Sequence, residues 1–174
     1  MTLPKFPYLL IFLIFVSMAL SGLSVKIETL RPAPPKVQVV IYKKIFSYCK
    51  NLSKDGINVA VLTDESNPDF EEIIRGFTNL GIPVVELKND KFQTQSKITV
   101  LYVSKSSKSI VSHCNNRGVL CISATPEDVQ ENLAAISIYS ENNKPKIIIN
   151  MSVLKSQNHE ISSEVLKLAT IVGE

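Results

Sequence analysis

Residues 144–174, KPKIIINMSVLKSQNHEISSEVLKLATIVGE, contain the two elements that we expect to complete the fold. A buried strand over Ile147–Ile149 ends at Asn150 and leads into a short helical turn. Ser162 is typical of a helix N-cap, because its hydroxyl can accept a hydrogen bond from a backbone N–H of the first turn. Apolar residues then recur at intervals of three and four. They predict a closing amphipathic helix with one buried face: Ile161, Val165, Leu168, Ala169 and Val172.

The chain upstream of this stretch alternates between short apolar runs and helix-length patterns. The runs are rich in β-branched residues and predict buried strands over 57–62, 82–87, 98–103 and 119–123. Helices are expected between them, over 36–52, from Asn67 onward and over 107–116. This alternation is typical of right-handed βαβ units that build a mainly parallel sheet. Pro83 has no backbone N–H to donate, so its strand is expected at the sheet edge.

The sheet is expected to close with an antiparallel pair. Two apolar runs, 134–139 and 146–150, flank the sequence ENNKP, which is typical of a hairpin turn. The predicted fold class is therefore α/β: a three-layer Rossmann-like sandwich, mainly parallel, with an antiparallel pair near the C-terminus. In the first helix, five apolar residues share a face that should pack across the sheet: Val37, Val40, Ile41, Ile45 and Tyr48.

Residues 1–24 have the layout of a secretory signal peptide. A short basic start (MTLPK) precedes an almost wholly apolar core, and small residues follow it. We expect cleavage between Ser24 and Val25. The alternative is an uncleaved membrane anchor, but the core is shorter than the about 20 residues that a spanning helix needs. Residues 25–35 are then a Pro-rich linker, and residues 36–174 form the folded domain.

The charge of the chain argues against nucleic acid as a partner. The 19 basic and 16 acidic residues give a formal net charge of +3. The basic residues form no cluster with interleaved aromatic side chains. The sequence also lacks glycine-rich phosphate-binding motifs and the G-x-S-x-G motif, so it assigns neither a cofactor nor a catalytic residue.

Few titratable side chains qualify as candidate site residues. Asp64 and Glu65 follow the first buried strand, at the edge where α/β proteins bind ligands, although acidic residues there also cap helices. His113 and Cys114 are neighbours in a helix, where adjacent side chains diverge by about 100°, so we do not expect a nucleophile–base pair. His159 is expected to be a polar loop residue, and two distant histidines specify no metal site.

The cysteines suggest one disulfide. A helix end and the turn at Gly118 separate Cys114 from Cys121, so the two side chains could approach closely enough for a bridge in an oxidising compartment. The alternative is that both are buried free thiols. We favour the bridge. Cys49 is then unpaired, and we expect it to be a small apolar residue of the first helix.

Four segments of the chain carry a family resemblance: IYKKIFSYCKNL (41–52), INVAVL (57–62), AAISIY (134–139) and the ending KIIINMSVLKSQNHEISSEVLKLATIV (146–172). Together they resemble the YfiR-like family of bacterial periplasmic proteins. The resemblance implies a non-catalytic Rossmann-like domain that is often dimeric. The spacing of Cys114 and Cys121 is also similar to that of a disulfide in the family. The implied function is restraint of an inner-membrane diguanylate cyclase through its periplasmic sensor domain, which keeps cyclic di-GMP and biofilm formation low.

Two classes of function therefore compete. The first is a periplasmic regulatory protein that acts by protein–protein contact, with the membrane cyclase as partner. The alternative is a periplasmic small-molecule-binding α/β protein, since open α/β sheets bind ligands beyond the carboxyl ends of their strands. An enzyme would need a nucleophile or an acid–base pair that the sequence does not display.

Overall fold

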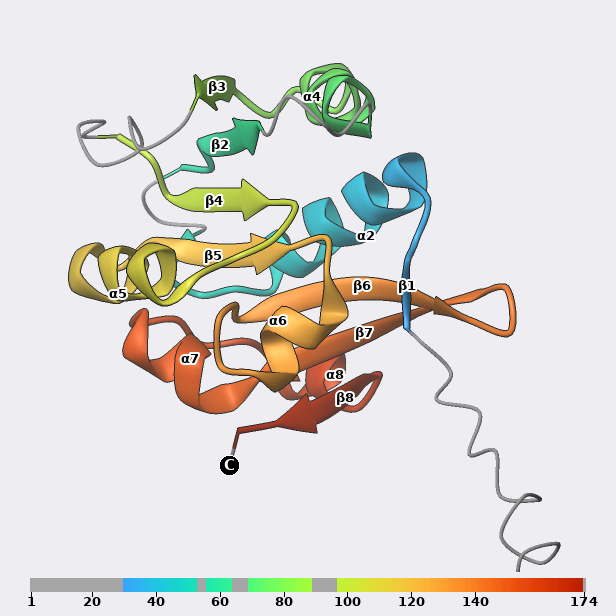
Figure 1. Ribbon diagram of the computed structural model, residues 1–174, viewed down its shortest axis with the longest axis vertical. Coiled ribbons are helices and arrows are strands. Elements are labelled where there is room, and N and C mark those ends of the chain that lie inside the picture. Colours follow the sequence, from blue (N-terminus) through green and yellow to red (C-terminus); the bar gives the residue numbers. More distant parts are fainter. Residues whose placement is uncertain (1–29, 53–55, 64–68, 89–96, 174) are drawn as a thin grey trace, which may run out of the picture.

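The computed structural model describes residues 30–52, 56–63, 69–88 and 97–173 (Figure 1). Within these ranges, eight strands form one sheet: β1 (Arg31–Pro32), β2 (Val59–Thr63), β3 (Val84–Lys88), β4 (Val100–Val103), β5 (Leu120–Ser123), β6 (Ile136–Glu141), β7 (Lys144–Asn150) and β8 (Ala169–Val172). The helices are α2 (Pro35–Ser47), α4 (Asp69–Asn79), α5 (Lys108–Arg117), α6 (Pro126–Gln130), α7 (Met151–Ser156) and α8 (Ser163–Leu166). The expected signal peptide, with Ser24 and Val25, lies outside the described residues.

The strands follow the order β3-β2-β4-β5-β6-β7-β8, and β1 pairs with β6 beside this path. Neighbours from β3 to β6 are parallel, whereas β6 and β7 form an antiparallel hairpin. Asn142 and Asn143 have φ angles of 50° and 59° at the hairpin turn, a region that asparagine tolerates. The predicted mainly parallel sheet with one late antiparallel pair is confirmed, and β3 lies at the sheet edge as Pro83 indicates.

Helices cover both faces of the sheet, which makes the domain a three-layer sandwich (Figure 1). On one face, α2 packs against α4, and Phe46 is fully buried between Tyr42 and Phe77, with ring centroids 6.0 and 6.2 Å away. On the other face, Cys114 of α5 and Val129 of α6 pack onto the strands. None of the helices in the described ranges has the length and apolar character needed to cross a membrane.

Helix α2 buries a different face from the one that its periodicity predicts. Val40 was expected in the core but is 60% exposed. The polar Gln38 is buried instead, because its Nε2 donates to Ala33 O at 2.6 Å and its Oε1 accepts from Tyr102 Oη at 3.0 Å. The predicted face is therefore wrong for Val40, and the buried residues of α2 are Gln38, Val39, Tyr42, Ile45 and Phe46.

The chain ends in a strand, so the predicted closing helix is wrong. Residues Ser163–Leu166 form a single helical turn, α8, and Ser162 makes no side-chain cap hydrogen bond to it. Residues Ala169–Val172 form β8, which runs parallel to β7 with Ala169 opposite Ile147. Three of its four residues are β-branched and suit a pleated strand. Pairing with β7 therefore overrides the helical spacing of the apolar residues.

Residues 31–35, the last part of the predicted Pro-rich linker, pair with the sheet and lead into its first helix. Arg31 and Pro32 pair with β6 as the strand β1. Ala33 is buried, and its backbone N–H donates to Ile138 O at 3.1 Å. Pro35 then begins α2, a position where proline costs no hydrogen bond. The extended conformation expected of this segment is what allows it to pair with the sheet.

Candidate functional site

An open apolar groove lies between α2, β7 and α8, with a volume of about 490 Å³. We call it the α2–α8 groove. Its two most exposed large apolar residues are Val40 on α2, 60% exposed, and Leu168 just before β8, 75% exposed. The lining residues are Val40, Ile41, Lys44, Ile45, Tyr48, Lys144, Pro145, Lys146, Ile147, Glu164, Val165 and Leu168.

The groove arises because α2 has more apolar residues than one face can bury. Tyr42 and Phe46 point into the core. Val40, Ile41 and Tyr48 lie along another side of the helix and line the groove. Leu168 is exposed because α8 lasts one turn and β8 begins directly after it. Clustered exposed apolar side chains of this kind mark sites of interaction in soluble proteins.

The rim of the α2–α8 groove is mainly basic. Lys44, Lys144 and Lys146 line it, and Glu164 is its single acidic residue. Lys146 is partly neutralised by Glu141, whose carboxylate lies 3.8 Å from its ammonium. The remaining positive charge favours an occupant that brings carboxylates to the rim of an apolar contact.

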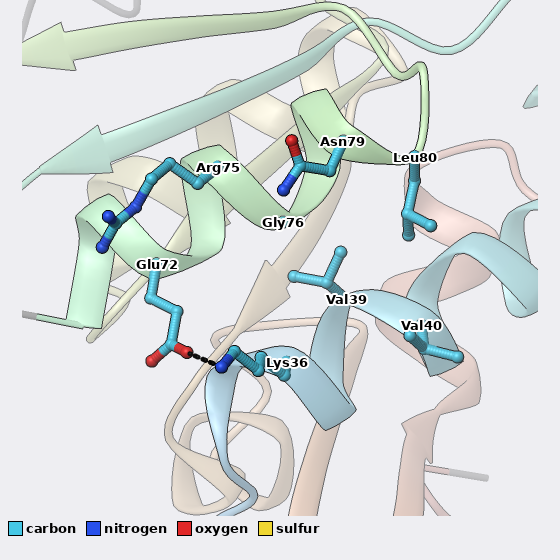
Figure 2. A pocket seen from close by; sticks show the side chains of 8 residues that line it. All are labelled: Lys36, Val39, Val40, Glu72, Arg75, Gly76, Asn79 and Leu80. Atoms are coloured by element: carbon cyan, nitrogen blue, oxygen red, sulfur yellow. Dashed lines mark ion pairs between the residues drawn. The ribbon is translucent and has the colours of Figure 1, made fainter.

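A second groove, the α2–α4 groove, lies on the other side of Val40 and has a volume of about 420 Å³ (Figure 2). Lys36 of α2 and Glu72 of α4 form an ion pair across it at 3.5 Å. The helices approach closely at Gly76, where an added Cβ would lie 3.0 Å from Val39. Arg75, Asn79 and Leu80 complete a lining that is more polar than that of the α2–α8 groove.

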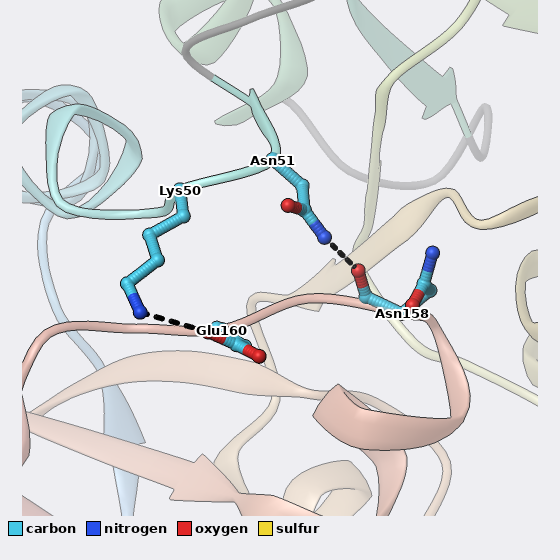
Figure 3. A network of polar contacts seen from close by, with 4 residues as sticks. All are labelled: Lys50, Asn51, Asn158 and Glu160. Atoms are coloured by element: carbon cyan, nitrogen blue, oxygen red, sulfur yellow. Dashed lines mark hydrogen bonds and ion pairs between the residues drawn. The ribbon is translucent and has the colours of Figure 1, made fainter.

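Two segments distant in sequence are joined beyond the end of α2 (Figure 3). Lys50 donates from Nζ to the Glu160 carboxylate at 2.9 Å and from its backbone N–H to Glu160 O at 3.1 Å. Asn51 Nδ2 donates to Asn158 O. The hydrogen bond and charge of Lys50 lower the pKa of the exposed Glu160 carboxyl. These contacts hold residues 48–52 against residues 158–162.

His159 is a loop residue, as expected, but its side chain is buried beside this network. It is 5% exposed, and Nε2 is 3.1 Å from Gly118 O. Because a carbonyl only accepts, Nε2 carries the proton, and Nδ1 of the neutral ring faces the Cys49 thiol at 3.7 Å. Cys49 is buried as expected but lies just beyond α2, and burial raises the pKa of its thiol. The pair is a structural contact in the interior.

The neutral state of His159 should make the domain sensitive to acid. Burial lowers the pKa of His159 below its ordinary value, although the hydrogen bond to Gly118 opposes this. The unfolded chain therefore binds the proton more readily, and the stability contributed by neutral His159 is lost as pH falls below about 6.5. We expect urea unfolding at about pH 7.5 and about pH 5.5 to show a smaller difference in His159→Gln than in the wild type.

The partly exposed His113 provides the control for this pH effect. Its pKa is also lowered, by partial burial and by Arg117, but it lies on the outer side of α5 and not in the interior contact. His113→Gln should therefore keep most of the acid sensitivity. An unchanged pH dependence in His159→Gln would contradict the assignment.

The two cysteines of the predicted disulfide are neighbours in space, but both thiols are free and buried. Contact with the Cys121 thiol, followed by burial, raises the pKa of Cys114 far above its ordinary range. Gly118 at the end of α5, with φ of 64°, turns the chain so that the two residues meet. The bond itself stays a prediction.

Oxidation should join Cys114 and Cys121 and leave Cys49 as a free thiol. A disulfide that closes a loop this short contributes about 2–3 kcal/mol to the free energy of unfolding. We expect protein taken from the periplasm, then unfolded and alkylated, to show one labelled cysteine by mass spectrometry. If the unfolded protein is reduced before alkylation, all three cysteines should be labelled. A denaturation midpoint unaffected by reduction would argue against the bond.

The remaining candidates from the sequence are the two acidic residues that follow the first buried strand. Asp64 and Glu65 lie outside the described residues. A buried carboxylate that the sequence analysis missed is Asp128, which accepts from Ser106 N and Ser123 Oγ, both at 2.6 Å. Burial raises the pKa of Asp128. Asp128 ties the loop after β4 to the end of β5. The sequence around it, TPEDVQE (125–131), indicates only the start of a helix.

Among the described residues, no group of three or more His, Cys, Asp or Glu side chains is placed to hold a metal ion. What the described residues present is two open grooves beside α2, one lined mainly by apolar side chains and the other more polar. The described residues thus form a three-layer α/β domain with an exposed apolar surface beside α2, a kind of surface that marks sites of interaction in soluble proteins.

The comparisons with known proteins identify the family. The YfiR/HmsC-like family model matches residues 37–170, so the chain belongs to the YfiR/HmsC-like family. This is a family of periplasmic regulators of cyclic di-GMP signalling. A comparison with curated protein sequences found no match.

A solved structure supports the fold. It is described as "The Crystal Structure of the ABC domain in complex with L-Trp from Streptococcus pneumonia", with a TM-score of 0.55 and 15% sequence identity. The match covers 80% of this chain but 60% of the other, so this chain spans a little over half of that structure. At this identity the likeness concerns the α/β fold alone.

Proposed function

We propose that this protein restrains an inner-membrane diguanylate cyclase by binding the periplasmic sensor domain of that enzyme, and so keeps cyclic di-GMP and biofilm formation low. Membership of the YfiR/HmsC-like family supports the class of partner. The observation that carries the proposal is the α2–α8 groove, where Val40 and Leu168 expose apolar surface beside lysine side chains. Apolar anchors with a polar rim are typical of protein–protein interfaces.

The charges of the groove specify the chemistry of the bound segment. Lys44 and Lys144 would pair with acidic side chains of the sensor domain, while apolar side chains of that domain cover Val40 and Leu168. Charge pairs at a rim mainly raise the association rate, and apolar anchors mainly slow dissociation. Binding should therefore weaken with rising salt without being abolished.

The first experiment is deletion of the gene, followed by measurement of cyclic di-GMP. The level should rise, and expression of the wild-type protein should restore it. Crosslinking in the periplasm should recover a membrane protein that contains a cyclase domain. An unchanged level together with no crosslinked cyclase would overturn the proposed function.

A substitution in the groove tests where the partner binds. Val40→Glu should weaken binding about 30-fold, because a charge at the centre of a desolvated contact costs roughly 2 kcal/mol or more. The matched control is Val85→Glu, since Val85 is 39% exposed and lies on β3, at the opposite edge of the sheet. In the deletion strain, expression of Val85→Glu should restore the low cyclic di-GMP level, whereas expression of Val40→Glu should not. Equal effects of the two variants would exclude the groove.

Small-molecule binding is the second candidate function. The α2–α4 groove, at about 420 Å³, has the size of a metabolite site, and the Lys36–Glu72 pair supplies polar groups beside its apolar floor. A thermal-shift screen of periplasmic metabolites discriminates the two candidates. A ligand whose stabilisation disappears in Lys36→Ala but remains in Lys44→Ala would favour this function.

A further inference from the structure

The exposed side of helix α2 has a groove on each flank, and Val40 lines both of them. Val40 is 60% exposed, whereas its neighbour Val39 is buried. Figure 2 shows Val40 and Leu80 on the side of the α2–α4 groove that is away from the Lys36–Glu72 ion pair. The apolar side of the α2–α4 groove therefore meets the α2–α8 groove at Val40.

Each groove alone is small for a stable protein–protein interface. Twelve residues line the α2–α8 groove and eight line the α2–α4 groove, with Val40 common to both. A standard interface uses about 20–30 residues of each partner. The two grooves reach about that size only together, with the exposed α2 residues between them, such as Lys43, included.

The two grooves also carry the same excess of positive charge. The α2–α4 groove has Lys36 and Arg75 but one carboxylate, Glu72. The α2–α8 groove has three lysines and one carboxylate. The sequence of α2 contains no acidic residue, and Val40 lies four positions from both Lys36 and Lys44, on the same side of the helix. A partner that covers Val40 therefore meets cations on both flanks of α2, and carboxylates on that partner would complement both.

We propose that the periplasmic sensor domain of the cyclase lies across α2 and fills both grooves at once, with apolar side chains in each groove and acidic side chains around them. Such an interface rests on the proposed function and extends it, because the same partner then also occupies the α2–α4 groove. Val40 lies at its centre, where exclusion of water makes a contact most important. Since Val40 lines both grooves, Val40→Glu does not distinguish one occupied groove from two.

The binding assay uses purified full-length protein and right-side-out membrane vesicles from the deletion strain, which expose periplasmic domains to the solution. Vesicles from a strain that also lacks the cyclase recovered by crosslinking give the background. The wild-type protein should sediment with the vesicles that contain the cyclase and not with the others. Binding to neither kind of vesicle, or equal binding to both, would overturn the proposed function and the two-groove interface with it.

Tryptophan substitutions test whether the partner enters the α2–α4 groove. Asn79 is exposed and lines this groove but not the other, so Asn79→Trp should obstruct it and weaken vesicle binding about tenfold or more. The matched control is Thr78→Trp, because Thr78 is the exposed neighbour on α4 and lines neither groove. Its binding should stay within about twofold of the wild type. Thermal melts of both variants verify that they fold.

Charge substitutions compare the two grooves directly. Arg75 lines only the α2–α4 groove and Leu168 only the α2–α8 groove, and both Arg75→Glu and Leu168→Glu should weaken binding about tenfold or more. Lys108→Glu, at the start of α5 on the opposite face of the sheet, controls for net charge and should bind like the wild type.

The pattern of losses separates the two-groove interface from the proposed function. Weakened binding in Leu168→Glu, with wild-type binding in Arg75→Glu and Asn79→Trp, would overturn the two-groove interface and leave the proposed function intact. Wild-type binding in Leu168→Glu would also overturn it, because the partner would then not occupy the α2–α8 groove. An equal loss in Lys108→Glu would overturn it as well, since net charge and not the grooves would then determine binding.

Discussion

Phe46→Ala should lower the free energy of unfolding by about 3–5 kcal/mol, the cost of a large aromatic-to-alanine change in a packed core. Phe46 is fully buried and stacks on both Tyr42 and Phe77 at centroid distances of 6.0 and 6.2 Å. Its removal leaves a cavity between α2, α4 and the sheet that these rings cannot fill. Against a typical total stability of about 5–15 kcal/mol, this loss is large.

Val40→Ala is the matched control on the same helix. Val40 is 60% exposed, and surface substitutions of this kind change stability by about 0.5 kcal/mol or less. Urea unfolding of the two variants therefore reports which face of α2 is inside. Comparable losses at both positions would contradict the orientation of the helix.

The orientation of α2 shows where sequence periodicity stops being informative. The pattern correctly predicts a helix that packs on the sheet, but too many of its residues are apolar to define one face. The deciding contact is polar and long-range, because Gln38 is held inside by Tyr102, 64 residues away. No pattern within the helix contains that information.

The end of the chain shows a second limit. Leu168, Ala169 and Val172 fit a helical repeat, whereas Thr170–Val172 favour a strand through their β-branched side chains. Four residues are too few for either pattern to dominate, and the pairing of Ala169 with Ile147 decides the outcome. The strands with longer apolar runs, such as β2 and β4, could be predicted because their local preference and their place in the sheet agree.

The residues of the candidate site are brought together almost entirely by the tertiary structure. The α2–α8 groove combines α2 with residues that follow it by about a hundred positions, such as Lys144 and Leu168. His159 likewise finds its partners at Cys49 and Gly118, which are 110 and 41 residues away. The sequence shows that α2 has more apolar residues than one face can bury and that lysines lie elsewhere in the chain. It does not show that these residues meet in one groove.

Asn150→Ala should lower the free energy of unfolding by about 2–4 kcal/mol, from a lost helix cap and buried groups left without partners. Asn150 is completely buried. Its Nδ2 donates to Val129 O and Asn132 Oδ1, both at 2.8 Å. Its Oδ1 accepts from Ser152 Oγ at 2.8 Å and from Val153 N at 3.0 Å, which caps α7. One side chain thus fixes the end of β7 to the helix after it and to the α6 region.

Gly173 makes this prediction testable as a coupling. It follows β8 with φ of 69°, and an added Cβ would overlap the Asn150 side-chain amide. Gly173→Ala should therefore be destabilising in the wild type, through both the steric overlap and the left-handed backbone. In an Asn150→Ala background the overlap disappears and only the backbone cost remains. Chemical denaturation of the four proteins in this double-mutant cycle should give a coupling of about 1–3 kcal/mol. Additive effects would mean that a side chain at position 173 does not meet the Asn150 amide.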